Sequence, residues 1–168
     1  MHWYALKIFY NRTAPLLKEL VEDGVEHFSP AEVIPSLLFV RSDERYVMLL
    51  GESHRQEAWV YRSLDNRQRP AEIPDHEMDV FRFVVTAGRQ GLMLLGDDRP
   101  EYHEGDRVVV TGGPFKGAEG HIKRIKRDRR LVVAIKGVVA VATTYIHPSL
   151  LRKVDESDAQ KAFGWGRL

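Results

Sequence analysis

The residues of this chain that could carry out chemistry are spread along it and form no known catalytic set. No two of its seven histidines are four positions apart, the spacing that places two zinc ligands on one helix face. Cysteine is absent, which excludes disulfides, thiolate zinc sites and cysteine nucleophiles. There is no nucleophile elbow, phosphate-binding loop or dinucleotide fingerprint. The sequence therefore favours a binding protein over an enzyme, and predicts neither a metal nor a cofactor.

Two clusters of charged residues remain to be interpreted. Asp75, Glu77 and Asp79 open a predicted helix, where its dipole favours negative charge, so a structural role is expected. The second cluster has six cations among eight residues: Lys123, Arg124, Lys126, Arg127, Arg129 and Arg130. If this run spans two strands and their hairpin tip, it would attract nucleic acid or an acidic protein surface. The alternative is a solubilising edge that discourages sheet aggregation. No aromatic residue interrupts the run, so base stacking is not expected from it.

The formal charge of +1 hides a dipolar chain. Residues 1–104 carry 12 basic and 18 acidic side chains, whereas residues 105–154 carry 11 basic and 3 acidic ones. The polar stretch 96–104 separates the two parts, which predicts a linker there. Nothing resembles a membrane span or a signal peptide, so a cytoplasmic protein is expected.

The acidic part is expected to alternate strands and helices. Strands are predicted at 3–10, 37–40 and 58–62, with a weaker extended segment at 25–33. Amphipathic helices are predicted at 14–23, from a cap at Ser42 or Asp43 to Gly51, and from Pro74 to Gly88. The basic part shows five short strands and glycine-bearing turns, which predict a small β-barrel.

The turn that opens the basic part is the most specific motif. Residues 105–130 read GDRVVVTGGPFKGAEGHIKRIKRDRR, a strand, a Gly-Pro turn and a second strand. Gly117 and Gly120 are expected at positive-φ or crowded backbone positions, and Phe115 is expected to cover the barrel mouth. The pattern resembles a KOW motif, here with Gly113, Phe115, Lys116, Gly117 and Gly120, which occurs in ribosomal proteins and in NusG-family transcription factors.

The N-terminal residues favour the second of these classes. Trp3-Tyr4, the 14–23 helix and Pro35 to Val40 resemble, in order and spacing, the N-terminal domain of NusG-family proteins. Residues 34–40 and 141–146 resemble the UpxY-type specialised paralogues of Bacteroides-like bacteria, which are antiterminators of capsular polysaccharide operons. The resemblance implies an α+β fold: an α/β sandwich over 1–95 with an antiparallel sheet and flanking helices, a 96–104 linker, an SH3-like KOW barrel over 105–154, and a polar tail over 155–168.

The resemblance also implies partners and contact residues. An apolar patch would dock on the clamp helices of the largest RNA polymerase subunit, and by position it comprises Lys7, Leu37 and Phe39. The alternative for Leu37 and Phe39 is a place in the core, where Leu and Phe on a strand are more often found. Non-template DNA, or alternatively nascent RNA, would be contacted, and Asn11, Arg12 and Arg62 are the expected DNA contacts. The KOW domain would meet the ribosome or termination factor Rho, and a monomer is expected. A ribosome-associated or general RNA-binding KOW protein is the alternative, and the sequence leaves open whether the two domains dock.

Overall fold

The structure is a computed structural model and describes residues 1–154. Its N-terminal sheet has four antiparallel strands in the order β2-β3-β1-β4. They are β1 (His2–Ile8), β2 (Glu26–Phe28), β3 (Leu37–Ser42) and β4 (Ala58–Val60). Strand β1 is central and has apolar residues on both faces, because each face is covered by helices.

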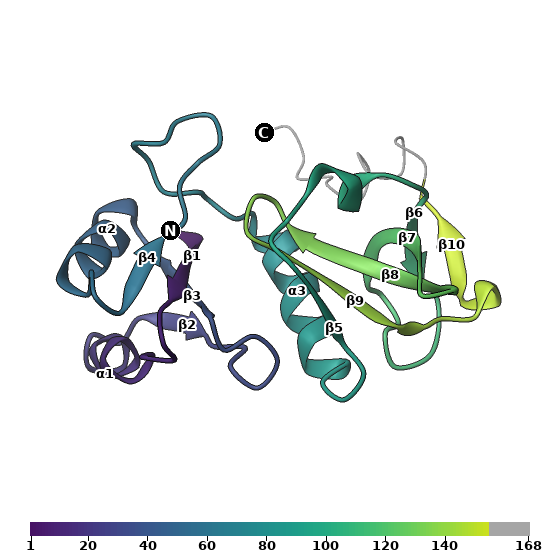
Figure 1. Cartoon of the computed structure of the whole chain (residues 1–168), viewed down its shortest axis with the longest axis horizontal. Coiled ribbons are helices and arrows are strands. Elements are labelled where there is room, and N and C mark those ends of the chain that lie inside the picture. The colour runs from purple at the N-terminus through teal and green to yellow at the C-terminus, as the bar shows by residue number, and fades with distance from the viewer. Residues whose placement is uncertain (155–168) are drawn as a thin grey trace, which may run out of the picture.

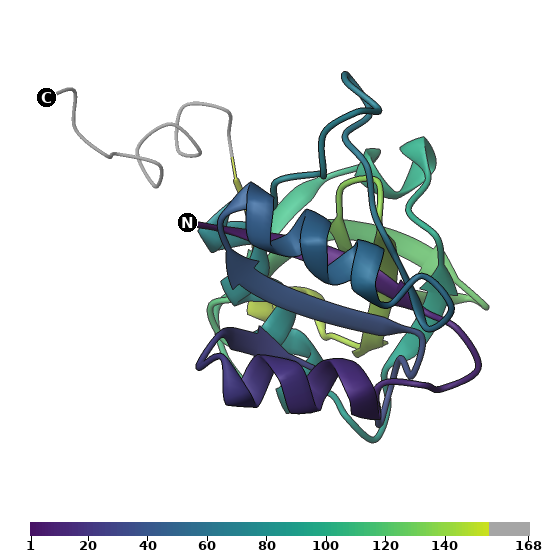
Figure 2. The same ribbon diagram turned by 90° about the vertical axis from the view of Figure 1, so that its left-hand side faces the viewer.

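Two helices cover one face of the N-terminal sheet (Figure 2). They are α1 (Ala14–Glu22) and α2 (Glu44–Ser53), and their buried residues join Tyr4, Leu6 and Leu38 in one cluster. Asp43 caps α2 by accepting a hydrogen bond from the Tyr46 backbone N–H at 2.7 Å. The helix does not end at Gly51, as predicted from the sequence, but runs on to Ser53. Gly51 instead allows close packing, since a Cβ there would lie 2.5 Å from a Val60 methyl group.

Helix α3 (Asp75–Ala87) lies between the opposite face of this sheet and the C-terminal strands (Figure 1). Its buried residues Met78, Phe81, Val84 and Val85 follow the predicted helical spacing, and it ends at Gly88 as predicted. These residues belong to one continuous cluster with Ala5 and Phe39 of the N-terminal sheet and with Leu131 and Val133 of β8. The two parts of the chain therefore dock and share a core across α3.

The C-terminal sheet has six antiparallel strands in the order β10-β6-β7-β8-β9-β5. They are β5 (Met93–Gly96), β6 (Arg107–Val110), β7 (Glu119–Ile125), β8 (Asp128–Ile135), β9 (Val139–Tyr145) and β10 (Leu151–Lys153). Two short 3-10 helices, Pro100–His103 and Pro148–Leu150, lie between strands. The predicted α+β fold, an antiparallel sheet with helices followed by a β-sheet with the KOW motif, is confirmed.

One strand crosses the predicted boundary between the N-terminal domain and the linker. Strand β5 pairs with β9, so residues 93–95 of the expected N-terminal domain lie in the C-terminal sheet. The expected 96–104 linker contains the Pro100–His103 turn. The predicted polar tail at 155–168 lies outside the described residues. Among residues 1–154, no helix has the length and apolar character to cross a membrane.

Backbone amides of the C-terminal sheet are held by carboxylates near α3. The Lys136 N–H donates to Glu77 Oε1 at 2.7 Å, and the Gly137 N–H donates to Asp98 Oδ2 at 2.9 Å. Leu64 from the N-terminal part also lies close to Gly137. The β8–β9 turn is therefore held by Glu77 of α3, by Asp98, which follows β5, and by packing against Leu64. This turn borders the candidate site.

Candidate functional site

The residues predicted to meet RNA polymerase lie on one face of the N-terminal sheet. Lys7 of β1 is in register with Leu37 of β3, and Ala5 is in register with Phe39. Lys7 is also in register with Trp59 of β4. Lys7, Leu37 and Trp59 therefore form a row across three strands, which we call the cross-strand row, on the face that α3 packs against.

Phe39 takes no part in the exposed surface. It is fully buried, with its ring centroid 5.4 Å from that of Phe81 on α3 and 6.3 Å from that of Phe28. Leu37 is also buried, whereas Lys7 is exposed. In this conformation only one of the three predicted patch residues offers its side chain to a partner. A contact role for Phe39 stays a prediction that would require α3 to move.

Trp59 is the residue of this face that sequence reasoning did not select. It is 44% exposed and packs edge-on against Tyr61, with ring centroids 5.1 Å apart. Large aromatic side chains at a half-exposed site are frequent anchors in protein interfaces. The alternation in the 58–62 segment places Trp59 and Tyr61 on one face, so this signal was present in the sequence.

A narrow crevice of about 70 Å³ lies where the C-terminal sheet meets the row. Its walls include Lys7, Leu37 and Tyr61 on one side and Leu94, Asp97, Val138 and Val139 on the other. Burial, with the negative charge of Asp97, raises the pKa of Tyr61 to about 12, so its hydroxyl stays protonated. The C-terminal sheet therefore covers the cross-strand row at Leu37, whereas Trp59 at the other end of the row is accessible to a partner.

The predicted DNA-contact residues lie near another hollow, at the free edge of β4. This hollow has a volume of about 340 Å³ and is lined by Phe9, Met48, Arg55, Trp59 and Arg62, among others. Asn11 has a φ of 56°, and Arg12 lies over the ring of Tyr10, 5.7 Å from its centroid. Phe9 lines the hollow together with Arg62, and it precedes Asn11 and Arg12 in the β1–α1 loop. The structure therefore brings this loop and Arg62 to one side of the molecule.

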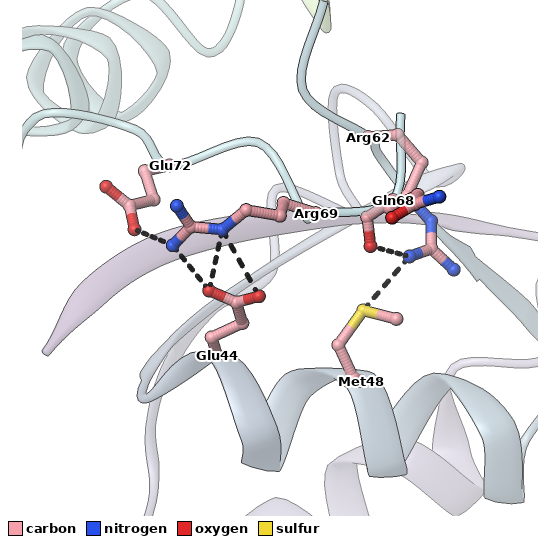
Figure 3. A network of polar contacts seen from close by, with 6 residues as sticks. All are labelled: Glu44, Met48, Arg62, Gln68, Arg69 and Glu72. Atoms are coloured by element: carbon pink, nitrogen blue, oxygen red, sulfur yellow. Dashed lines mark hydrogen bonds and ion pairs between the residues drawn. The ribbon is translucent and has the colours of Figure 1, made fainter. Parts of the chain in front are cut away.

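Arg62 is held by two contacts over α2 (Figure 3). One terminal nitrogen donates to Met48 Sδ at 3.2 Å and to the Gln68 carbonyl at 3.4 Å. Arg69 fixes the other end of the same loop, because its guanidinium donates to Glu44 at 2.7 and 3.2 Å and lies 3.6 Å from Glu72. The hydrogen bond from Arg69 lowers the pKa of Glu44. These contacts order the 63–69 loop beside the hollow.

The KOW residues form a turn that reaches α3. Gly113 and Gly117 have φ of 80° and 93°, and a Cβ at Gly120 would collide with the carbonyl oxygen of Val132, which confirms the predicted backbone roles of Gly117 and Gly120. Phe115 is buried, and its ring would lie 3.0 Å from a Cβ at Gly88. Phe115 therefore packs against the C-terminal end of α3 and connects the KOW turn to that helix. Lys116, the next residue, is exposed.

The six cations of the basic run lie on two paired strands and their hairpin tip, the arrangement in which they would attract nucleic acid or an acidic surface. Strands β7 and β8 pair with Lys123 opposite Arg130 and Arg124 opposite Arg129, and Lys126 and Arg127 form the two-residue tip. Four of the six are exposed, while Lys123 and Arg130 are half-buried. We call residues Lys123–Arg130 the basic hairpin.

Three histidines that are distant in sequence meet in a hollow of about 300 Å³ between α3 and the C-terminal sheet. His76, His103 and His121 line it with Glu77 and Glu119, among other residues. His103 is 2.8 Å from Asp98, and His76 is 3.5 Å from Glu119. Burial raises the pKa of Glu77 and lowers that of His121. Nonetheless, no group of three side chains in residues 1–154 is arranged to hold a metal ion.

Comparison with protein families identifies one match. The KOW motif model matches residues 104–135, from the residues before β6 to the end of β8. Comparison with curated proteins gave no match. The chain thus carries a KOW motif, of the kind found in transcription and ribosomal factors, in the region that follows an α+β domain. That order of domains is consistent with a NusG-like architecture.

Proposed function

We propose that this protein is a transcription antitermination factor that binds RNA polymerase and promotes processive elongation. The observation that carries the proposal is the KOW motif at 104–135 placed after a domain whose antiparallel sheet has two helices on one face. The NusG-like order of these parts supports a polymerase partner, because the N-terminal domain of that family docks on the polymerase clamp helices.

The cross-strand row is the surface that we assign to this docking. Trp59 supplies a large half-exposed aromatic ring and Lys7 an exposed positive charge next to it. An aromatic anchor buried in a partner groove contributes most of the free energy of such an interface, whereas the charge favours correct orientation. Asn11, Arg12 and Arg62 would lie near the DNA, where Arg contacts to phosphate are salt-sensitive.

We further propose that the protein serves a capsular or other polysaccharide biosynthesis operon. This assignment is supported by the resemblance of residues 34–40 and 141–146 to the UpxY-type paralogues. A run-through transcription assay tests it: templates with the leader of a capsule operon should show increased read-through on addition of the protein, and unrelated leaders should not. Equal read-through on both kinds of template would contradict specialisation.

Binding to polymerase is tested with the full-length chain. In a pull-down with RNA polymerase or its isolated clamp helices, Trp59→Ala and Lys7→Glu should each weaken capture. Leu49→Ala is the matched control, because Leu49 is an apolar residue, 52% exposed, on helix α2 at the opposite face. No capture of the unmodified chain would contradict the proposal.

A ribosome-associated or general RNA-binding role is the second candidate, and the basic hairpin favours it. That role predicts co-sedimentation with ribosomal subunits which is unaffected by Trp59→Ala and lost when the hairpin cations are removed. The two candidates are therefore distinguished by Trp59→Ala, which should weaken capture of polymerase but leave co-sedimentation with ribosomal subunits unchanged.

A further inference from the structure

The tip of the basic hairpin has a backbone conformation that its residues do not favour. Lys126 and Arg127 have φ of 49° and 74°, and they connect Ile125 directly to its cross-strand partner Asp128. A two-residue turn with positive φ at both positions favours Asn-Gly, since side chains with a Cβ are strained there. Two cations occupy this turn at a cost to hairpin stability.

The strands of the hairpin place like charges opposite one another. Lys123 faces Arg130 and Arg124 faces Arg129, and such pairs destabilise a ladder. Within residues 1–154, Asp128 is the one carboxylate at ion-pairing distance from the six cations, 3.5 Å from Arg130. An anionic polymer bound along the hairpin would offset this repulsion, because its phosphates can pair with the exposed cations of the strands and of the tip.

An exposed aromatic ring lies beside Arg130, on the face of the hairpin that also carries Lys123. Tyr145, at the end of β9, is 51% exposed and is in register with Arg130. A bulge produces this register, because three residues of β8 (130–132) face four residues of β9 (142–145). The buried Thr143 hydroxyl accepts the Leu131 N–H at 3.2 Å, and Arg130 donates to the Thr143 carbonyl at 3.3 Å. The bulge is therefore well supported and fixes Tyr145 next to the hairpin.

We propose that the basic hairpin and Tyr145 form a binding surface for single-stranded RNA. The exposed cations contact phosphates and the ring of Tyr145 stacks on a base. A single strand is required because a paired base does not offer its face to a side chain. The choice of RNA over DNA rests on the KOW motif, which is found in transcription and ribosomal factors, and on the proposed function, which places the protein near the nascent transcript.

The test uses the purified full-length chain and a fluorescently labelled, unstructured RNA oligonucleotide, with affinity measured by anisotropy at several salt concentrations. Lys126→Asn with Arg127→Gly should weaken binding and reduce the slope of log affinity against log salt by about 1.4, for two phosphate contacts. The same pair should raise the thermal midpoint, because Asn-Gly suits the turn. The charge-matched control is Lys18→Gln with Arg45→Gln, at two exposed sites in α1 and α2.

Tyr145 is tested by a pair of variants. Tyr145→Ala should weaken RNA binding about tenfold, and Tyr145→Phe should bind within about twofold of the unmodified chain, because the ring stacks without its hydroxyl. The inference is overturned if Tyr145→Ala binds normally, if the control pair weakens binding as much as the hairpin pair, or if single-stranded DNA or duplex RNA binds as tightly. No polymerase is present in this assay, so its failure is distinct from failure of the proposed function.

Discussion

Phe39 and Phe81 pack with their ring centroids 5.4 Å apart and so join the N-terminal sheet to helix α3. Both side chains are fully buried. The same helix packs on β8 through the shared core, so this aromatic pair links the candidate docking face to the C-terminal sheet. A change at either ring is expected to act on folding first.

Phe39→Ala should destabilise the protein by about 3–5 kcal/mol, the usual cost of removing a buried Phe ring. Urea denaturation measures this, and Phe39→Leu should lose less because most of the volume remains. A Phe39→Ala variant that kept its full stability but failed to bind polymerase would show that Phe39 is a contact residue after all.

The KOW glycines should differ in their response to alanine. Gly117→Ala should cost about 1 kcal/mol, because the residue has a φ of 93° but open space around its Cβ position. Gly120→Ala should cost about 3 kcal/mol, since the new methyl group meets the Val132 backbone, which must move. The free energies of unfolding of the two variants provide the comparison, and an equal loss at both positions would contradict this account.

Acidification should weaken the fold through His121. Burial, and then the nearby charges of His103 and Arg107, lower its pKa below 6.5, despite a hydrogen bond with the Gly105 carbonyl. The unfolded chain therefore takes up a proton before the folded chain does, and the free energy of unfolding falls as pH drops from about 6.5 towards the lowered pKa. Thermal midpoints measured from pH 7.5 to 5 test this decline.

His121→Gln should make that decline shallower, and this comparison isolates the histidine. Glu77 has the opposite sign: its raised pKa means that the folded chain binds the proton more readily, so its protonation adds stability as pH falls. If the pH profiles of His121→Gln and the unmodified chain were parallel, His121 would not be the group responsible.

Arg69→Ala should loosen the 63–69 loop, because its contacts with Glu44 and Glu72 are removed. Both partners are exposed, so we expect little effect on global stability. Limited trypsin digestion should instead cut faster after Arg67, which lies within the loop. An unchanged cleavage rate would mean that the backbone contacts of the loop, such as Ser63 N–H to the Arg69 carbonyl at 2.9 Å, are sufficient to order it.

Local sequence patterns predicted most elements because their causes are local. The apolar spacing of α3, the Asp43 cap and the backbone of Gly117 each depend on residues nearby in the chain. What the sequence did not predict depends on long-range pairing. Residues 93–95 belong to the C-terminal sheet because β5 pairs with β9. Gly51 lies inside α2, where its missing side chain leaves room for Val60 of β4.

The candidate sites divide in the same way. The basic hairpin was predicted, since all its cations lie within eight residues of one another. For Phe39 the sequence left a core position and a contact position both open, because a strand residue carries no sign of which helix will cover it. The position of Tyr145 beside Arg130 was also not predicted, because Tyr145 lies fifteen positions after Arg130 in the chain. Only the pairing of β8 with β9, with its bulge, brings the two side by side.

The most direct test of the polymerase-binding proposal is the affinity of the full-length chain for the isolated clamp helices of RNA polymerase, compared between the unmodified protein and Trp59→Ala. The proposal predicts measurable binding that falls about tenfold or more in Trp59→Ala, as expected for an aromatic anchor, while Leu49→Ala binds normally. Equal affinity of all three proteins, or no binding by any of them, would contradict it.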